Sequence, residues 1–224
     1  MITFENKDCM EAMKGFPDKF FDLALIDPPY GINIGKMNFV KGGATKRGKA
    51  IARHNDYSKT YNFDTQTPDQ SYFDELFRVS KNQIIWGGNY LTRFLPPSRG
   101  FICWDKRKDE KYNNDFADCE LAWMNEELGN ARVFRFLYSG CFTDCKEYEK
   151  RFHPNQKPIE LYEWCLRNYA KEGYKILDTH TGSASSLIAC HNLGYDAWGY
   201  EIDKNFYDKA RHRLDEHMAQ MSFF

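Results

Sequence analysis

Two short segments hold residue types that could do chemistry, and each directly follows an apolar run. The first is Asp27-Pro28-Pro29-Tyr30, after the apolar residues 21–26. Successive prolines lack N–H donors and fix an extended backbone, so the carbonyls beside them stay available as acceptors. A carboxylate beside a fixed carbonyl can accept both hydrogens of an –NH2 group, and Tyr30 can stack on the ring that carries it. An ordinary turn that ends a strand is the alternative.

The second segment, Asp-Thr-His-Thr-Gly-Ser-Ala-Ser at 178–185, lies between a strand-like run and a helix-like run. Its small residues would let a ligand approach the backbone, and amides at a helix start can hold an anion. Glu201 follows about 20 residues after the glycine turn, where a carboxylate can accept hydrogen bonds from ribose hydroxyls. The residues alone leave two interpretations open: a nucleoside-containing cofactor, or a helix capped by Ser183 and Ser185.

The elements that must position these segments alternate clearly in the last third of the chain. We expect helices at 158–170, 185–193 and 204–217, with strands at 175–179 and 197–202. Earlier strands are expected at 1–6, 21–26, 83–86 and 101–104, and an antiparallel pair at 119–124 and 131–138. Residues 31–66 are rich in Gly and Lys without periodicity, which predicts a functional loop. This alternation predicts a doubly wound, mostly parallel α/β sheet with ligands at the carboxyl ends of its strands.

Length and composition bound the class of protein. The 224 residues suit a single domain, 1–224, and the net charge of −1 argues against bulk coating of nucleic acid while leaving room for a local basic patch. No apolar stretch approaches the roughly 20 residues of a membrane span, and residues 1–6 do not resemble a signal peptide. The seven cysteines form no CxxC pair, so we expect reduced thiols, no metal site and a cytoplasmic protein.

Four motifs in order resemble the S-adenosylmethionine-dependent DNA amino-methyltransferases. Residues 27–30 match the family's catalytic tetrapeptide, and residues 178–185 resemble its cofactor loop. The hexapeptide His-Pro-Asn-Gln-Lys-Pro at 153–158 is similar to the one before the family's cofactor-side helix, and Asn-Lys-Asp-Cys at 6–9 is similar to its opening acidic motif. Because the tetrapeptide precedes the cofactor loop, the order resembles the circularly permuted β class. The resemblance implies a Rossmann-like methyltransferase fold, with a seven-stranded sheet and one antiparallel strand.

The resemblance also implies a reaction and a set of site residues. The chain would move a methyl group from S-adenosylmethionine to the N6 amine of an adenine flipped out of duplex DNA. Asp27 and the Pro28 carbonyl would accept the amine hydrogens, with Pro29 and Tyr30 completing the catalytic set. The implied cofactor contacts are Asp8, Cys9, Lys157, Asp178, Gly182, Ser183, Glu201 and Ile202. Two positions depart from the pattern, since His180 stands where the family usually has Phe and Ala184 where it has a second Gly.

Two inserted loops, at about 31–66 and 105–153, are the candidate DNA-contacting regions. Between Gly31 and Asn55 the chain has basic residues and no acidic one, which suits phosphate contact, with a merely solvated loop as the alternative. These basic residues are Lys36, Lys41, Lys46, Arg47, Lys49 and Arg53. A second basic cluster, Arg99 with 106–108, is diluted by acidic neighbours and is expected to be solvated surface.

Several functions compete with adenine methylation. Cytosine-N4 methylation uses the same geometry, but that branch usually has Ser where this chain has Asp27. Cytosine-C5 methylation needs a Pro-Cys nucleophile, which the chain lacks. Protein glutamine methyltransferases use a similar tetrapeptide, but their cofactor loop comes first. A non-catalytic nucleic-acid-binding subunit is the alternative from another class. The resemblance leaves open a homodimer, a cognate restriction endonuclease and the recognition sequence.

Overall fold

The computed structural model describes residues 1–33, 41–47, 50–56, 64–107, 117–139, 142–145 and 151–221, with backbone only for 41–47, 50–56, 139, 142 and 221. The chain divides into two compact units. One comprises Met1–Pro28 with Asp69–Phe224, and the other comprises Pro29–Pro68. The boundary falls inside the Asp-Pro-Pro-Tyr segment, so Asp27 and Pro28 belong to the first unit, and Pro29 and Tyr30 to the second.

The first unit is built on an eight-stranded sheet with the order β1-β12-β11-β2-β5-β7-β6-β8. In chain order its strands are β1 (Ile2–Glu5), β2 (Phe21–Ile26), β5 (Ser80–Trp86), β6 (Phe101–Asp105), β7 (Cys119–Met124), β8 (Arg132–Arg135), β11 (Lys175–Asp178) and β12 (Asp196–Tyr200). β7 runs antiparallel to both β5 and β6, and the other pairings are parallel. The predicted doubly wound, mostly parallel sheet with one antiparallel strand is confirmed.

Two details of the prediction were wrong, and both concern β8. The sheet has eight strands rather than seven, because β8 adds to its edge. The expected antiparallel pairing of 119–124 with 131–138 does not occur, since β6 lies between β7 and β8. β6 pairs antiparallel with β7 and parallel with β8. Sequence adjacency favoured a hairpin, whereas the sheet uses a crossover.

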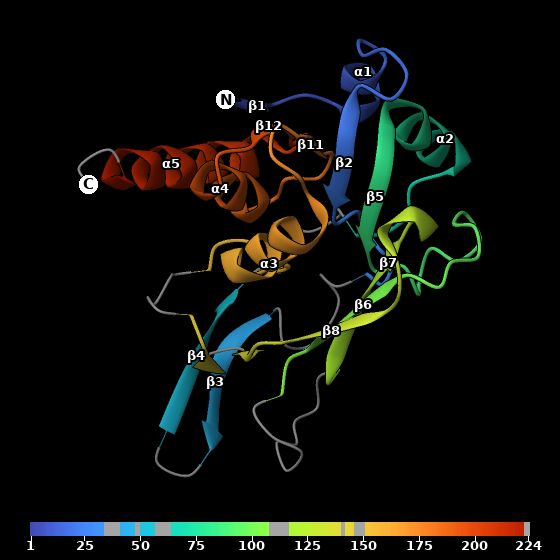
Figure 1. Ribbon diagram of the computed structural model, residues 1–224. Coiled ribbons are helices and arrows are strands. Elements are labelled where there is room, and N and C mark those ends of the chain that lie inside the picture. The colour runs from blue at the N-terminus through green and yellow to red at the C-terminus, as the bar shows by residue number, and fades with distance from the viewer. Residues whose placement is uncertain are drawn as a thin grey trace. The chain divides into compact units, whose positions relative to one another are not determined.

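Helices cover both faces of this sheet (Figure 1). α1 (Cys9–Met13) and α2 (Gln70–Val79) lie on one side, and α3 (Ile159–Tyr169), α4 (Ser185–Asn192) and α5 (Lys204–Met221) lie on the other. Two separate hydrophobic clusters result, and β2 contributes to both: Leu23 and Leu25 pack with α3 and α4, while Ala24 and Ile26 pack with α2. A strand buried on both faces explains the continuous apolar run that precedes Asp27.

Short elements complete the first unit. A 3-10 helix, η3 (Glu126–Leu128), follows β7, and β9 (Tyr138–Ser139) pairs antiparallel with β10 (Phe142–Thr143). No helix in the described part of the chain is long and apolar enough to cross a membrane.

The second unit contains a hairpin in the segment predicted to be an irregular loop. β3 (Lys41–Arg47) pairs antiparallel with β4 (Ala50–Asp56). Backbone pairing can form such a hairpin without an alternating apolar pattern, which is why the Gly- and Lys-rich sequence did not reveal it. Near the start of this unit, the Asp64 carboxylate accepts the backbone N–H groups of Tyr30 at 2.8 Å and Gly31 at 2.9 Å.

We predict that Gly199→Ala destabilises the fold. Gly199 lies on β12 against α4, and a Cβ there would stand 2.6 Å from Leu187 Cδ1 and 2.7 Å from Thr181 Oγ1. Overpacking of this kind costs about 1–3 kcal/mol. Gly173→Ala is the comparison, because a Cβ there meets nothing within 4 Å and only the φ of +80° is penalised. Urea unfolding should show a larger loss for Gly199→Ala, and equal midpoints for the two variants would contradict this packing.

Candidate active site

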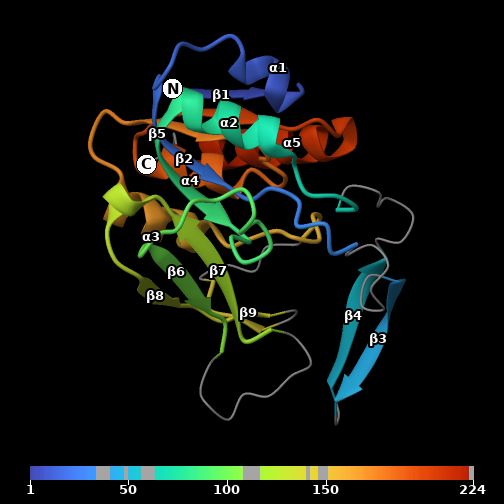
Figure 2. The ribbon, with the colours of Figure 1, turned by 90° about the vertical axis from the view of Figure 1, so that its right-hand side faces the viewer.

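The acidic residues of the predicted motifs gather at one edge of the sheet. Asp27 follows β2, Asp178 ends β11, and Glu201 follows β12. These strands are parallel and adjacent, so their carboxyl ends meet at the same edge. Figure 2 shows β2, the strand that leads to Asp27, from a second direction. The charges of Asp27 and Glu201 both raise the pKa of Asp178, as expected of neighbouring carboxylates.

A buried ammonium meets the first of these carboxylates. Lys157, just before α3, is 5% exposed and forms an ion pair with Asp27, whose side chain is 14% exposed. Its Nζ also lies 3.4 Å from Glu120 Oε2 and 5.7 Å from the centre of the Trp86 ring. Burial alone would lower the pKa of Lys157, but the carboxylates of Asp27 and Glu120 raise it above the ordinary value. Lys157 is therefore charged, and its ammonium pairs with the Asp27 carboxylate.

Glu120 and Lys106 complete this network, and the sequence did not single out either as functional. Glu120 stands on β7 directly opposite Trp104 of β6, and its Oε1 lies 3.0 Å from Lys106 Nζ. Burial would raise the pKa of Glu120, but Lys157 and Lys106 together hold it below the ordinary value. The expectation that Lys106 belongs to a solvated surface was wrong, since its side chain is only 17% exposed. The contact between Glu120 and Lys106 follows from the pairing register of β6 and β7, which the sequence pattern does not reveal.

The glycine turn leaves the start of α4 without a side-chain cap. The capping position is Ala184 in a left-handed conformation, with φ of 63°, and no side chain hydrogen-bonds there. Ser185 Oγ instead donates to the Lys157 carbonyl at 2.8 Å, and Ser183 Oγ lies 3.1 Å from Ser185 Oγ. The interpretation that Ser183 and Ser185 merely cap a helix is therefore wrong. The helix start keeps amides that can meet a ligand.

The two carboxylates beside this turn are held by short contacts. Asp178 accepts a hydrogen bond from Ser186 Oγ and another from the His180 N–H at 3.1 Å. Burial, with the charges of Asp27 and Glu201, raises the pKa of Asp178 to about 7 despite those bonds. Glu201 accepts the N–H groups of Gly182 at 3.0 Å and Asp203 at 2.9 Å, and burial raises its pKa. This edge of the sheet therefore favours positive charge.

The opening motif lies at the start of α1. Asp8 caps the helix, accepting the N–H groups of Met10 at 2.8 Å and Glu11 at 3.1 Å through one carboxylate oxygen. Burial raises the pKa of the Cys9 thiol to about 12, so it is a neutral packing group rather than a nucleophile. Ile202, next to Glu201, is 68% exposed.

His180 behaves as an aromatic ring at the position where the family pattern has Phe. Burial lowers its pKa to about 4, although Asp8 acts in the opposite direction. Its ring stands edge-on to Tyr72 with centroids 5.4 Å apart. Thr179 Oγ1 lies 2.6 Å from Tyr72 Oη and 2.9 Å from His180 Nδ1, which ties the cofactor loop to α2. A neutral ring in this network replaces Phe without adding charge.

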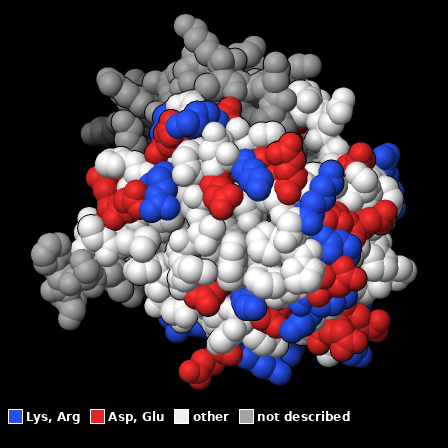
Figure 3. Space-filling model, turned by 90° about the horizontal axis from the view of Figure 1, so that it is seen from above, with Lys and Arg blue, Asp and Glu red and all other residues white. Residues whose placement is uncertain are grey.

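The predicted DNA-binding residues all belong to the second unit. Lys41, Lys46 and Arg47 lie on β3 and Arg53 on β4, where Ala44 is opposite Arg53, while Lys36 and Lys49 lie outside the described residues. Their role stays a prediction. Figure 3 shows the first unit from the end of the sheet at which β2 and β5 begin. Lysines and arginines alternate there with acidic residues, so this face shows no single-sign patch.

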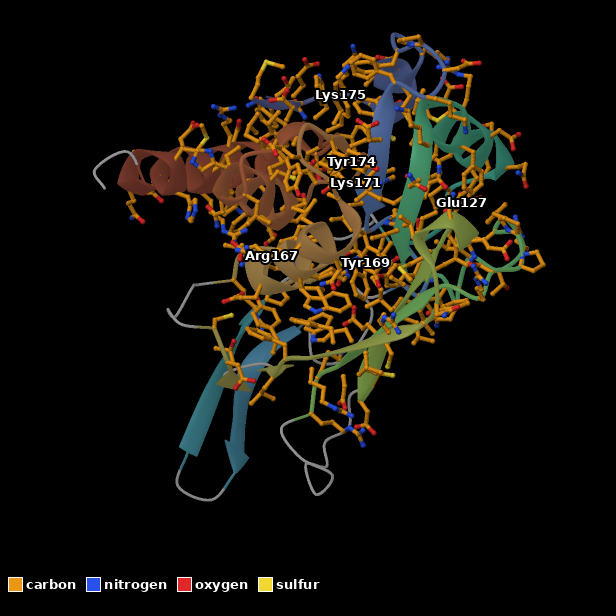
Figure 4. All side chains as sticks on the ribbon, in the orientation of Figure 1. Glu127, Arg167, Tyr169, Lys171, Tyr174 and Lys175 are labelled. Carbon is orange, nitrogen blue, oxygen red and sulfur yellow. The ribbon has the colours of Figure 1, made fainter. Side chains whose placement is uncertain are left out.

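A depression of about 500 Å³ lies away from the acidic edge. Figure 4 labels four of its lining residues, which are Glu127, Tyr169, Lys171 and Tyr174; the others are Lys81, Asn82, Leu128 and Asn168. It borders the amino-terminal ends of β5 and β11. Ligand sites of parallel α/β sheets form at the opposite, carboxyl ends of the strands, so the candidate site is the acidic edge.

Fold and site together define an α/β protein that binds a nucleoside-containing ligand where its parallel strands end. The comparisons name the family. The model of the N6 and N4 family described as "DNA methylase" matches residues 103–212. The type II methyltransferase M.HpaI of Haemophilus parainfluenzae is 36% identical over 238 residues, covering 93% of this chain and 72% of that enzyme. The chain belongs to the DNA methylase family, the S-adenosylmethionine-dependent methyltransferases that the four motifs predict.

Another relative matches part of the chain, and solved structures share its fold. The type II methyltransferase M2.DpnII of Streptococcus pneumoniae is 29% identical over 150 residues, and the match spans 63% of this chain but only about half, 53%, of that protein. The crystal structure of an M1.HpyAVI–SAM complex shares the fold at a TM-score of 0.57 and 18% identity, covering 95% of this chain and 100% of that one. The cytosine-N4-specific PvuII methyltransferase gives 0.58 at 11% identity, covering 97% and 92%.

The residues of the acidic edge fit the family's cofactor. S-adenosylmethionine carries a sulfonium and an ammonium group, and the edge presents the buried carboxylate of Asp178 beside those of Asp27 and Glu201. A cation there would favour the ionised form of Asp178, whose pKa is raised by burial and further by the charges of Asp27 and Glu201. The uncapped start of α4 and the glycine turn let a ligand approach the backbone.

We predict that Asp178→Asn changes how stability depends on pH in the cofactor-free protein. The folded-state pKa of about 7 exceeds the ordinary 3.8, so ionising this carboxyl costs folding stability progressively as pH rises from about 4 to 7. Asparagine does not ionise. The Tm of the variant relative to wild type should therefore rise by several degrees between pH 5 and pH 8.

Differential scanning calorimetry at the two pH values measures this difference. Asp74→Asn, at an exposed position of α2, is the matched control and should show the same difference from wild type at both. A constant difference for Asp178→Asn would contradict the burial of an ionising carboxyl at position 178.

Proposed function

We propose that the chain methylates the exocyclic N6 amine of an adenine flipped out of duplex DNA. The observation that carries the proposal is the carboxylate of Asp27, ion-paired with a buried ammonium and followed by two prolines. It stands at the carboxyl end of β2, at the acidic edge that fits the cofactor. A fixed acceptor is what an –NH2 group needs in order to be oriented there.

The proposed chemistry of the chain is hydrogen-bond acceptance. An adenine amine is a poor nucleophile because its lone pair is delocalised into the ring. Asp27 and the Pro28 carbonyl each accept one N–H, which draws the nitrogen toward tetrahedral geometry and localises the lone pair. S-adenosylmethionine, when bound, supplies an electrophilic methyl group on a sulfonium ion. The gain comes from positioning and from dipoles aimed in advance.

The remaining residues would hold the two ligands. Glu201 would accept hydrogen bonds from the ribose hydroxyls, with Ile202 against the cofactor's adenine ring and Asp8 at its amine. Asp178 would face the cofactor's cationic end, beside Gly182 and Ser183. Tyr30 would stack on the flipped base, and the basic residues of the second unit would meet DNA phosphates. We assign Lys157 to the Asp27 carboxylate, because the ammonium already pairs with it.

Adenine is proposed over cytosine because of Asp27. The N4 branch of the family usually has Ser in that position, and a carboxylate is the stronger acceptor for an amine hydrogen. The fold does not separate the two, since a cytosine-N4-specific enzyme is among the similar structures. The identity of the methylated nucleoside must therefore be measured.

The direct test is transfer of labelled methyl groups from S-adenosylmethionine to unmethylated genomic DNA, followed by digestion to nucleosides. The label should appear in N6-methyladenine. Label in N4-methylcytosine would overturn the adenine assignment, and no transfer by the folded, cofactor-binding protein would favour the non-catalytic subunit.

We predict that Asp27→Ala lowers methyl transfer by at least about 100-fold, because it removes a fixed acceptor for the target amine. Binding of S-adenosylhomocysteine, measured by calorimetry, should change only a few-fold. Asp208→Ala, on an exposed position of α5, is the control and should transfer like wild type. Full activity of Asp27→Ala would refute the proposed chemistry.

A further inference from the structure

In the proposed function, two groups compete for the Asp27 carboxylate: the Lys157 ammonium and the target amine. In the structure the carboxylate is ion-paired with the Lys157 ammonium, yet it must accept an N–H of the target amine. The Lys157 side chain is only 5% exposed. Withdrawing the ammonium from Asp27 without a second anion to receive it would strand a buried charge, which costs several kcal/mol. Asp27 can accept the amine readily only if a second carboxylate can pair with the Lys157 ammonium.

Glu120 provides that second anion. Its Oε2 is 3.4 Å from Lys157 Nζ, and it comes from a different strand, β7. A small shift of the flexible lysine side chain closes this distance to that of a strong charge-assisted hydrogen bond. Glu120 also has its own counter-ion, Lys106, on its other oxygen at 3.0 Å, so it stays ionised in either position of Lys157.

The charges of the network balance. Asp27 and Glu120 contribute two negative charges, and Lys157 and Lys106 two positive ones. The ammonium can therefore move between the carboxylates without changing the net charge of the interior. Trp86, whose ring centre is 5.7 Å from Lys157 Nζ, and Trp104, whose ring centre is 5.8 Å from Lys106 Nζ, face the two cations. Because an aromatic face attracts a cation, the Trp86 ring lowers the cost of moving the Lys157 ammonium beside it.

We propose that Glu120 is a positioning residue that takes over the Lys157 ammonium when the Asp27 carboxylate accepts the target amine. The inference rests on the proposed function, since it assumes that Asp27 receives an amine. It assigns a role to β7, a strand that carries none of the recognised motifs. Among the described residues, Glu120 is the other carboxylate beside this ammonium. Without it, Lys157 would stay on Asp27 and compete with the target amine.

The test compares single-turnover methyl transfer to DNA by wild type, Glu120→Gln and Glu126→Gln. Glu126 is an exposed glutamate of η3 and is the matched control. Glu120→Gln should lower the transfer rate at least about 10-fold, which corresponds to roughly 1.4 kcal/mol in activation free energy. The affinity for S-adenosylhomocysteine should stay within two-fold of wild type. Glu126→Gln should match wild type. An unchanged rate for Glu120→Gln would overturn the inference.

Two further variants separate this role from a structural one. In a Lys157→Met background, Glu120→Gln should cause no further loss of rate, because no ammonium remains to be held. An additive loss would overturn the inference and indicate a purely structural role. Glu120→Asp keeps the charge with a shorter reach and should give an intermediate rate, which tests the same claim if Glu120→Gln does not fold. Transfer by wild type tests the proposed function separately: if wild type transfers no methyl group, the proposed function has failed before any variant is compared.

Discussion

One buried charge organises this site. Lys157 brings an ammonium group into the interior, and such a group is stable there only where carboxylates surround it. It lies just before α3, so its backbone is fixed by that helix, and its carbonyl is held by Ser185 at the start of α4. Its ammonium pairs with Asp27 at the end of β2 and lies near Glu120 on β7. A single residue therefore connects the Asp-Pro-Pro-Tyr segment, the start of α4 and the antiparallel strand β7.

The rest of the acidic edge is a consequence of parallel strands. Because β2, β11 and β12 are adjacent and run the same way, the residues that follow them converge whatever their separation in the chain. Asp178 has no lysine partner among the described residues, and burial raises its pKa to about 7. The site thus divides into a neutralised part, where Asp27 faces Lys157, and a part that still attracts a cation. The first suits an amine acceptor, and the second suits a sulfonium cofactor.

Much of this could be predicted from the sequence, because the strongest signals are local. The apolar run before Asp27 predicted a strand buried on both faces, and β2 (Phe21–Ile26) matches it. The alternation after Pro158 predicted α3, β11, α4, β12 and α5 in the right order. What could not be predicted depends on pairing between distant residues. Glu120 meets Lys157 only because β7 lies antiparallel between β5 and β6, and the backbone-paired hairpin of β3 and β4 leaves no hydrophobic pattern.

The central claim is that Asp27 and Lys157 act as one buried pair. A double-mutant cycle on folding stability tests it directly, using Asp27→Asn, Lys157→Met and the double variant in the absence of ligands. Either single change leaves the network of Asp27, Glu120, Lys106 and Lys157 with one unbalanced charge, whereas the double change leaves it neutral, so the losses should not add. The account predicts a coupling free energy of at least about 2 kcal/mol in urea unfolding, with the double variant more stable than the sum of the single losses implies. Losses that add to within about 0.5 kcal/mol would show that the two residues are independent and would contradict it.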